Sequence, residues 1–409
     1  MKLITTTALA LVAALAATPA AAAQNKAATT APAQAEPKIT PSKGALKAIA
    51  DLQDTVNKKD YANVPAKVAA ADAVATTKED RYLIGKFQLD AALGTNDKTA
   101  IAAAIDKVAA SGVLDSTRAA SLYVGLGGTY FNDKQYPQAG SAYQKALALD
   151  PHNAEATKMV GEALFAAGQK AEAAAAFQRV IQASMAAGQK PDEALLKRAV
   201  AVAYDAQSPA AVDLARQWVT AYPSPGSWSD AIAIYTNLNH PDVEGRLDLY
   251  RLMQATGSLK TGGEYAQYAR AAAEQNNFNE AQAAFDAGVA AKLINPASSE
   301  YSDLVQGLKA KSKATAADLA VATKQAASGN ALVRIGDRYL AMGDQAKAVE
   351  TYKMAIAKPG TDVGLANLHL GMALAKSGDK AGATAALNAV KGSYASVAQF
   401  WLTYVNQRA

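Results

Sequence analysis

Apolar residues recur along most of this chain at the three- and four-residue spacing of amphipathic α-helices. Between Ala120 and about Ile181 the same order of small and large residues occurs twice, the second time 34 residues after the first. Small residues such as Gly127 and Ala139 let two helices approach closely, and bulky residues around them fill the gaps. Pro151 then ends the second helix, because proline lacks the amide hydrogen that a further turn needs. Each copy is therefore expected to be a pair of antiparallel helices.

The same pattern returns near the C-terminus, so four units are clear in the sequence. At the crossing of the two helices, Gly127 is expected to face Ala139, and Gly161 to face Ala173. The residues expected to pack within and between units are Tyr123, Leu126, Gly127, Tyr130, Ala139, Tyr143, Ala146, Gly161, Ala173, Phe177, Gly336, Tyr339, Ala348, Tyr352, Gly371 and Ala383. This set of positions resembles the tetratricopeptide repeat family. The resemblance implies an all-α fold, a right-handed superhelix (α-solenoid) of stacked antiparallel helix pairs with a C-terminal capping helix.

Weaker forms of the pattern extend the helix pairs to about ten over roughly residues 42–392. The expected order is helical hairpins over 43–117, two strong repeat units over 118–187, degenerate hairpins over 188–328, two further units over 329–392 and a capping helix over 393–409. Within these ranges we expect a long turn at Gly94–Asp97 and a helical hairpin without signature residues from Ser298 to Ser328. The last helix places four large apolar residues at helical spacing and is expected to cover the exposed end of the stack.

The first 42 residues are expected to direct export rather than to fold. Residues 1–23 contain Lys2, the apolar run Leu9–Ala17 and a final Ala21–Ala23, which is the order of a signal peptide. That apolar run is too short to cross a bilayer permanently. Residues 24–42 are rich in Ala, Pro, Thr and Gln, and a segment with so few large apolar groups is expected to be a disordered tether.

Composition and charge restrict where the mature chain works and what it binds. The sequence has no cysteine, so it has neither disulfides nor a thiol for a lipid anchor, and no other apolar segment reaches the roughly 18 residues of a membrane span. We therefore expect the mature chain in the periplasm of a Gram-negative bacterium, with secretion beyond the outer membrane left open. The 41 basic and 36 acidic residues are scattered, without the basic run that binds nucleic acid.

Few residues in the sequence point to chemistry. The three histidines lack ligand partners at metal-binding spacing, and His369 has no His or carboxylate at i+4, so no metal is expected. The glycines from Gly125 to Gly128 follow no strand, and they are interpreted as helix-packing residues rather than a dinucleotide-binding loop. Serine nucleophile elbows and phosphate-binding loops do not occur in the sequence. We expect neither a cofactor nor catalysis.

One short segment, Leu252–Gln254, faintly resembles the lytic transglycosylases, periplasmic enzymes that carry their catalytic domain on a helical superhelix. That family has an upstream Glu-Ser pair, whereas no such pair occurs here and Glu244 is followed by Gly245. Acid catalysis at a glycosidic bond requires a carboxyl group whose pKa is raised by an apolar, preorganised setting. We expect no such setting around Glu244.

In proteins that the chain resembles, the first helix of each pair lines a concave groove that holds an extended peptide or a partner helix. The resemblance gives this role to Ser121, Val124, Gly128, Phe131, Asn132, Glu155, Lys158, Glu162 and Phe165. Near the C-terminus the groove is expected to include Asn330, Asp337 and Lys376, with His369 close by. Some relatives clamp a C-terminal carboxylate with Lys and Asn at the places held here by Val124 and Gly128, and this departure argues against that kind of binding.

Three groove positions allow two interpretations. Gly128 either lets a ligand backbone approach closely or is a tolerated weak position, since glycine inside a helix costs about 1 kcal/mol relative to alanine. Phe131 and Phe165 are either core residues or groove residues. Truncating a buried phenylalanine costs about 3–5 kcal/mol, whereas truncating one in the groove leaves folding intact.

The sequence therefore predicts a non-catalytic periplasmic scaffold or adaptor that binds a protein or peptide partner, in envelope assembly or polysaccharide export. A second interpretation is an enzyme, or the accessory of an enzyme, that acts on the peptidoglycan cell wall and embraces glycan or peptide stems. A purely structural spacer is the third.

Overall fold

The computed structural model describes residues 39–311 and 313–408, and every regular element in these ranges is helical. They contain 21 α-helices and two short 3-10 helices, which confirms the predicted all-α fold of stacked helix pairs. The predicted signal peptide and most of the predicted tether lie outside the described residues. None of the helices in the described part of the chain combines the length and the apolar character that crossing a membrane requires.

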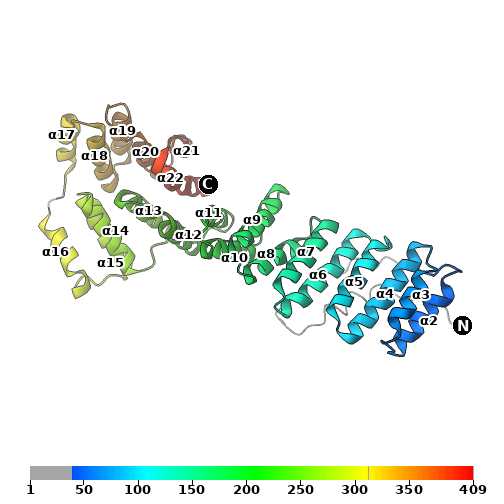
Figure 1. Ribbon diagram of the computed structural model, residues 1–409. Helices are drawn as coiled ribbons and strands as arrows, with labels where there is room; N and C mark the ends of the chain where they lie inside the picture. Colours follow the sequence, from blue (N-terminus) through cyan, green and yellow to red (C-terminus); the bar gives the residue numbers. More distant parts are fainter. Residues whose placement is uncertain (1–38, 312, 409) are drawn as a thin grey trace. The chain divides into compact units, whose positions relative to one another are not determined.

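The helices belong to two compact units, divided between Ala186 and Ala187. The first unit contains α2 (Leu46–Asn57), α3 (Val64–Asp72), α4 (Lys78–Thr95), α5 (Lys98–Ala110), α6 (Ser116–Asn132), α7 (Tyr136–Leu149), α8 (Ala154–Ala166) and α9 (Lys170–Ala186). Each even-numbered helix packs along the helix that follows it, and successive pairs stack on one another (Figure 1).

The connection between α4 and α5 is shorter than the long turn predicted at Gly94–Asp97. Helix α4 ends only at Thr95, and Asn96 adopts a left-handed conformation with a φ of 54°. Asp97 already caps α5, because its carboxylate accepts a hydrogen bond of 3.0 Å from the backbone N–H of Ala100. Gly94 lies inside α4, where a side chain would collide with the ring of Tyr61. This glycine permits close packing and does not form the turn.

A glycine in the first helix of each clear repeat unit lets a large side chain of the second helix approach. A methyl group added at Gly127 would lie 2.5 Å from Cε1 of Tyr143, and one at Gly161 would lie 2.9 Å from Cε2 of Phe177. The ring of Tyr143 is therefore the group that a side chain at position 127 would meet first. The residues predicted to pack within and between units are all buried, except Tyr130, which is half-buried.

The second unit begins with three helix pairs and ends with two more and a final helix. Its elements are α10 (Glu193–Asp205), α11 (Ala210–Ala221), α12 (Pro225–Asn239), α13 (Val243–Thr256), α14 (Gly262–Glu274), α15 (Phe278–Ala290), η1 (Ser299–Tyr301), α16 (Ser302–Ala310), α17 (Ala316–Gln325), α18 (Gly329–Ala341), α19 (Gln345–Ile356), α20 (Val363–Ser377), α21 (Lys380–Asn388), η2 (Gly392–Tyr394) and α22 (Ala395–Gln407). The glycine contact recurs here, since methyl groups at Gly336 and Gly371 would lie 2.5 Å from Tyr352 and Leu387.

The segment from Ser298 to Ser328 does not form the closely packed hairpin that was predicted. Helix α16 packs against α15, and α17 packs against α18 (Figure 1). The physical reason is a shortage of apolar surface, because α17 buries just Leu319 and α16 buries Leu304 and Leu308. Each of these short helices is therefore held by its neighbour rather than by the other.

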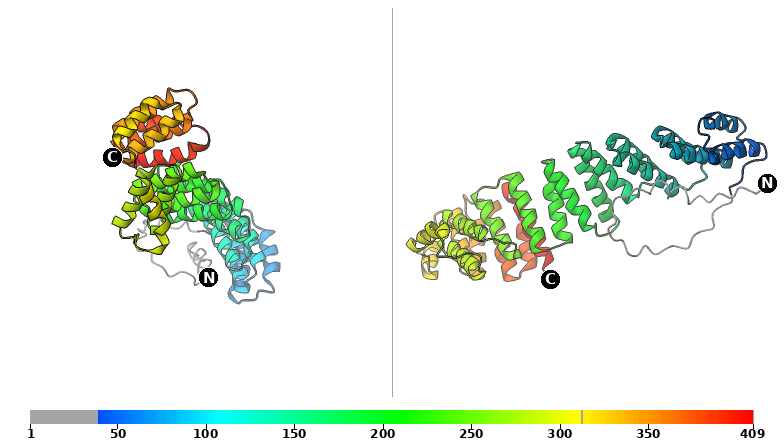
Figure 2. Two further views of the ribbon diagram at one scale, coloured as in Figure 1. Left: turned by 90° about the vertical axis from the view of Figure 1, so that its left-hand side faces the viewer. Right: turned by 90° about the horizontal axis from the view of Figure 1, so that it is seen from below.

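The end of the second unit folds back onto its beginning. Helix α22 packs on α21 and also touches α11 and α13, and Figure 2 shows this red C-terminal helix beside green helices of the same unit. Helix α15 touches α18. The ring of Phe400 meets that of Tyr235 edge to face at a centroid distance of 5.6 Å. The side-chain amide of Gln407 donates to the carbonyl of Val219 at 2.9 Å. The last helix therefore joins early and late helix pairs of this unit.

Candidate functional site

The residues predicted to line a groove on α6 and α8 lie at the surface of the first unit. We call these nine residues, Ser121, Val124, Gly128, Phe131, Asn132, Glu155, Lys158, Glu162 and Phe165, the groove face. Asn132, Glu155 and Lys158 are exposed, and the other six are partly exposed. None of the nine is buried, whereas the packing residues on the same two helices are buried apart from half-buried Tyr130.

Gly128 and its neighbour Gly127 have different surroundings. A methyl group added at Gly128 would have Oη of Tyr143 as its nearest neighbour from another helix, at 3.9 Å, which is an ordinary contact. At Gly127 the same ring is 2.5 Å away, closer than two carbon atoms can approach. Helix packing therefore requires a glycine at Gly127 and leaves space at Gly128.

Phe131 and Phe165 are both half-buried, so each contributes to packing and to the surface. The ring of Phe131 meets that of Tyr136 edge to face, with a centroid distance of 5.3 Å. Near them, the ammonium group of Lys158 lies 3.6 Å from a carboxylate oxygen of Glu155 on the same helix. The groove face thus combines two aromatic edges with charged groups of both signs.

The corresponding face of α18 and α20 in the second unit is mostly buried. We call Val333, Asp337, Leu340, Leu365, Leu368 and Met372, all of which are buried, the covered face. The prediction that Asp337 and His369 line an open groove is wrong, because they are 3% and 0% exposed. Asn330 and Lys376 are exposed. In the same unit α15 packs on α18 and α22 packs on α20, and α13 meets both α18 and α20 through the side-chain pairs Glu244–Arg334 and Asp248–His369.

A buried group of charged side chains joins the covered face to α13 and α15, and we call it the ionic cluster. Its members are Glu244, Asp248, Arg251, Glu280, Arg334, Asp337 and His369. Nε and Nη2 of Arg251 each donate to a different oxygen of Glu280 at 2.7 Å, and Nη1 donates to Asp248 at 2.7 Å. Burial alone would lower the pKa of Arg251, but the carboxylates of Glu280 and Asp337 outweigh it and raise that pKa. The guanidinium therefore stays charged in the core.

His369 lies between two carboxylates of the ionic cluster. Its Nε2 is 3.0 Å from Oδ1 of Asp248, and its Nδ1 is 2.7 Å from Oδ1 of Asp337. Asp337 also accepts a hydrogen bond of 2.7 Å from the hydroxyl of Tyr352. Burial opposes a charge on His369, but Asp248 and Asp337 outweigh it and raise the pKa of the imidazole to about 10. These contacts connect α13, α18, α19 and α20.

Glu244 lies at the edge of the ionic cluster with a side chain that is 6% exposed. Its Oε2 accepts a hydrogen bond of 2.5 Å from Nη1 of Arg334. Its Oε1 is buried, has no hydrogen-bond partner among the described residues and lies 3.9 Å from Nε2 of His369. Burial raises the pKa of Glu244 above its usual range, more than His369 lowers it. The expectation that this carboxyl has no setting that raises its pKa is therefore wrong.

A pocket of about 400 Å³ opens beside Glu244, and we call it the Glu244 pocket. It is lined by Asp242, Val243, Glu244, Gln275, Asn330, Val333, Arg334, Asp362, Leu365 and Tyr394. Asp242 and Asp362 cap α13 and α20, with their carboxylates accepting from backbone N–H groups at 2.8 and 3.0 Å. Solvent therefore reaches the edge of the ionic cluster between the starts of these two helices.

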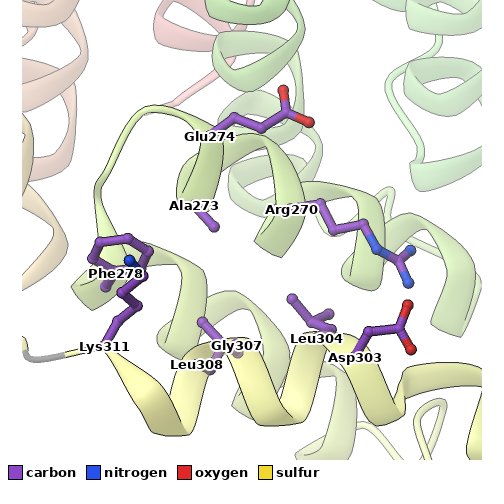
Figure 3. A pocket seen from close by; sticks show the side chains of 9 residues that line it. All are labelled: Arg270, Ala273, Glu274, Phe278, Asp303, Leu304, Gly307, Leu308 and Lys311. Atoms are coloured by element: carbon purple, nitrogen blue, oxygen red, sulfur yellow. The ribbon is translucent and has the colours of Figure 1, made fainter.

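A second pocket, of about 410 Å³, lies between α14, α15 and α16 (Figure 3). Phe278, Leu304 and Leu308 supply apolar surface, and Figure 3 shows the guanidinium of Arg270 pointing toward the carboxylate of Asp303. The ammonium of Lys311 lies 5.7 Å from the centre of the Phe278 ring, a cation–π distance. The residues of this pocket suit contact with an amphipathic surface rather than a chemical reaction.

Potential metal ligands do converge in the described residues, although none was predicted. A carboxylate oxygen of Glu244, one of Asp248 and a ring nitrogen of His369 lie within 4.8 Å of one another. The available sequence signal was the spacing of Glu244, Asp248 and Arg251, which places three charges on one face of α13. Three charges on one helix face usually point to solvent. Their partners Asp337 and His369 lie far away in the sequence, so residue spacing could not identify them as partners.

Two segments of the chain match the same protein family. A family model described as "Tetratricopeptide repeat" matches residues 124–189 and 333–398. These segments contain the two repeat pairs in which the glycine and large-residue contact described above is found. None of the curated proteins compared with the chain is similar to it in sequence.

Several solved structures also match the chain. A tetratricopeptide repeat protein from Parabacteroides merdae is 11% identical, with a TM-score of 0.25, over 81% of this chain and all of that one. The apo form of RapI is 13% identical, with a TM-score of 0.27, over 76% of this chain and 96% of that one. The TPR domain of P58(IPK) is 12% identical, with a TM-score of 0.21, over 89% of this chain and 97% of that one.

Proposed function

The chain is a tetratricopeptide repeat protein, and from this premise we propose that it is a non-catalytic scaffold that holds a protein or peptide partner on its groove face. One observation carries the proposal: the nine residues of the groove face are all partly or fully exposed, whereas the packing residues of α6 and α8 are buried apart from half-buried Tyr130. The exposed parts of these side chains are available for a partner.

The chemistry of the groove face suits a peptide or helix with apolar anchors and mixed charge. Phe131 and Phe165 offer aromatic edges, which a partner's apolar side chains can cover. Glu155 and Lys158 are exposed ends of a weak ion pair, so both signs of charge are available at the rim. On α6, Gly128 leaves room for a partner's backbone to approach.

We further propose that the mature chain acts in the periplasm, in envelope assembly or polysaccharide export. The signal-peptide-like order of residues 1–23 supports this location. An enzyme or enzyme accessory acting on the cell wall is the second candidate. Its specific support is Glu244, a carboxyl with a raised pKa beside a pocket of about 400 Å³.

Site-specific photocrosslinking in isolated envelopes tests the scaffold. The photoreactive amino acid p-benzoylphenylalanine is placed at Ser121 or at Glu155 on the groove face, and at exposed Gln144 on α7 as the matched control. We expect one partner to be crosslinked from Ser121 and Glu155 and not from Gln144. Equal adducts from all three positions, or adducts from Gln144 alone, would show that the groove face is not the binding surface.

A further inference from the structure

Three side chains that metals bind converge from α13 and α20 of the second unit. They are Glu244, Asp248 and His369, which are 5%, 0% and 0% exposed and whose ligand atoms lie within 4.8 Å of one another. One imidazole nitrogen and two carboxylate oxygens make a ligand set that Zn²⁺ and related dications accept. We propose that these residues bind one divalent transition-metal ion, with a further coordination position facing the Glu244 pocket.

Two of the proposed ligands are hydrogen-bonded through their other polar atom, and the third, His369, lies beside a carboxylate. Oε2 of Glu244 is bonded to Arg334, and Nδ1 of His369 lies 2.7 Å from Asp337. Oδ1 of Asp248 is bonded to Arg251 at 2.7 Å. Oε1 of Glu244, Oδ2 of Asp248 and Nε2 of His369 are then the atoms directed at the ion. Metal sites use outer residues in this way to orient their ligands.

The unpartnered oxygen of Glu244 is an independent reason to expect a cation here. Oε1 is buried and has no hydrogen-bond partner in the described part of the chain, and the 3.9 Å to Nε2 of His369 is too long for a hydrogen bond. A buried polar atom without a partner is costly. A metal ion bound between Oε1 and Nε2 would give Oε1 of Glu244 the partner that it lacks.

The charge balance of the ionic cluster favours a dication. Four carboxylates, from Glu244, Asp248, Glu280 and Asp337, face the guanidiniums of Arg251 and Arg334. With a neutral imidazole at His369, two negative charges of this buried group are uncompensated, and a divalent ion neutralises both. A proton on His369 neutralises one of them.

Arg251 is the group that competes with the ion. Its Nη1 lies 3.3 Å from Nε2 of His369, on the side from which the metal would coordinate. Two hydrogen bonds to Glu280 hold the guanidinium toward α15, and Oδ1 of Asp248 stays bonded to it while Oδ2 coordinates the ion. The Glu244 pocket supplies the entry path and room for a bound water.

The test is a titration of the full, untagged chain, stripped with EDTA, with Zn²⁺ by calorimetry and with Co²⁺ by visible absorption. His152 and His240 are exposed, so both are first replaced by Asn in every protein to remove surface ligands. We expect one ion per chain. Glu244→Gln should weaken binding more than about 10-fold. Glu350→Gln removes an exposed carboxylate of α19 that lies outside the ionic cluster, and it should retain the site.

Two results of the titration would overturn the proposal. Absence of Zn²⁺ binding to the parent chain, or equal affinity in the parent and the Glu244→Gln protein, would each contradict it. If Glu244→Gln does not fold, the Co²⁺ spectrum of the parent chain decides. Intense d–d bands of a low-coordinate nitrogen and oxygen site support the proposal, and the weak spectrum of hydrated Co²⁺ contradicts it.

Discussion

The two clear repeat pairs, α6–α9 and α18–α21, share their internal packing and differ in the surroundings of their first helices. In both pairs a glycine of the first helix receives a large residue of the second, as Gly127 receives Tyr143 and Gly336 receives Tyr352. On α6 and α8 the groove face is exposed or half-exposed, whereas the covered face of α18 and α20 is buried. The repeat signature therefore specifies how the two helices of a unit pack together. It does not specify whether the outer face of the first helix is exposed to solvent or covered by other helices.

The difference follows from what the two faces carry. The covered face is mostly aliphatic, with Leu340, Leu365 and Met372 among its residues, and it gains free energy when α13, α15 and α22 exclude water from it. The groove face carries Ser121, Asn132 and charged residues, whose burial would cost free energy without partners. The covered face is filled by its own chain, so it is not open to a protein partner, whereas the groove face is at the surface.

Removing the central charge of the ionic cluster should have the largest effect. In Arg251→Ala, the carboxylates of Asp248 and Glu280 lose their buried partner, which should cost about 3–5 kcal/mol in the unfolding of the second unit. Arg246→Ala on the same helix is the control, because Arg246 is exposed and should change stability by less than about 0.5 kcal/mol. Urea denaturation followed by circular dichroism measures both, and similar losses would mean that the cluster does not hold the covered face.

The response to pH should also distinguish the two units. In the metal-free chain the pKa of His369 is raised from 6.5 to about 10, so its stabilising charge is fully present below pH 6.5 and is lost as the pH rises toward 10. In the first unit, burial raises the pKa of Asp80, but backbone N–H groups of Ser42, Thr76 and Thr77 outweigh it and lower the pKa to about 2. That contribution is present above pH 3.8 and is lost as the pH falls toward 2.

Hydrogen exchange at α20 and α4 measures these two responses separately. Exchange at α20 should speed up between pH 7 and 10, after correction for the intrinsic pH dependence of exchange, and exchange at α4 should speed up below pH 4. His369→Gln should abolish the alkaline response, and Asp80→Asn should abolish the acid one. If exchange at α20 still speeds up at alkaline pH in His369→Gln, a group other than His369 causes the response.

The sequence predicted the packing inside the repeats better than the contacts between distant ones. Gly127, Tyr143, Gly336 and Tyr352 could be placed because the spacing within one helix pair limits which residues can meet. The contact of His369 with Asp248 spans 121 residues, and no periodicity relates two such positions. The aliphatic covered face was itself a signal for burial, but its partner helices carry no signature that would identify them.

Alanine substitutions at the adjacent glycines should have effects of opposite sign. Gly127→Ala places a methyl group 2.5 Å from Cε1 of Tyr143, and this overpacking should cost about 1–3 kcal/mol. Gly128→Ala meets no close atom and removes a flexible residue from a helix, so it should stabilise the first unit by up to about 1 kcal/mol. Gly336→Ala should behave like Gly127→Ala, and thermal melts of the three variants measure this. Equal effects at Gly127 and Gly128 would contradict the distinct environments of the two residues.

The smallest effect on stability, and the largest on binding, is expected for a bulky residue at Gly128. In Gly128→Leu the new side chain projects from the groove face. The atom of another helix nearest to its Cβ is Oη of Tyr143, at 3.9 Å, so there is no clash and the melting temperature should not fall. The same side chain occupies the space that a partner backbone would use, and the crosslink from Ser121 should disappear. Gln144 is an exposed residue of α7, so Gln144→Leu adds the same apolar group away from the groove face and should leave the crosslink unchanged. Loss in both variants would indicate a general effect of added apolar surface, and retention in Gly128→Leu would place the partner elsewhere on the chain.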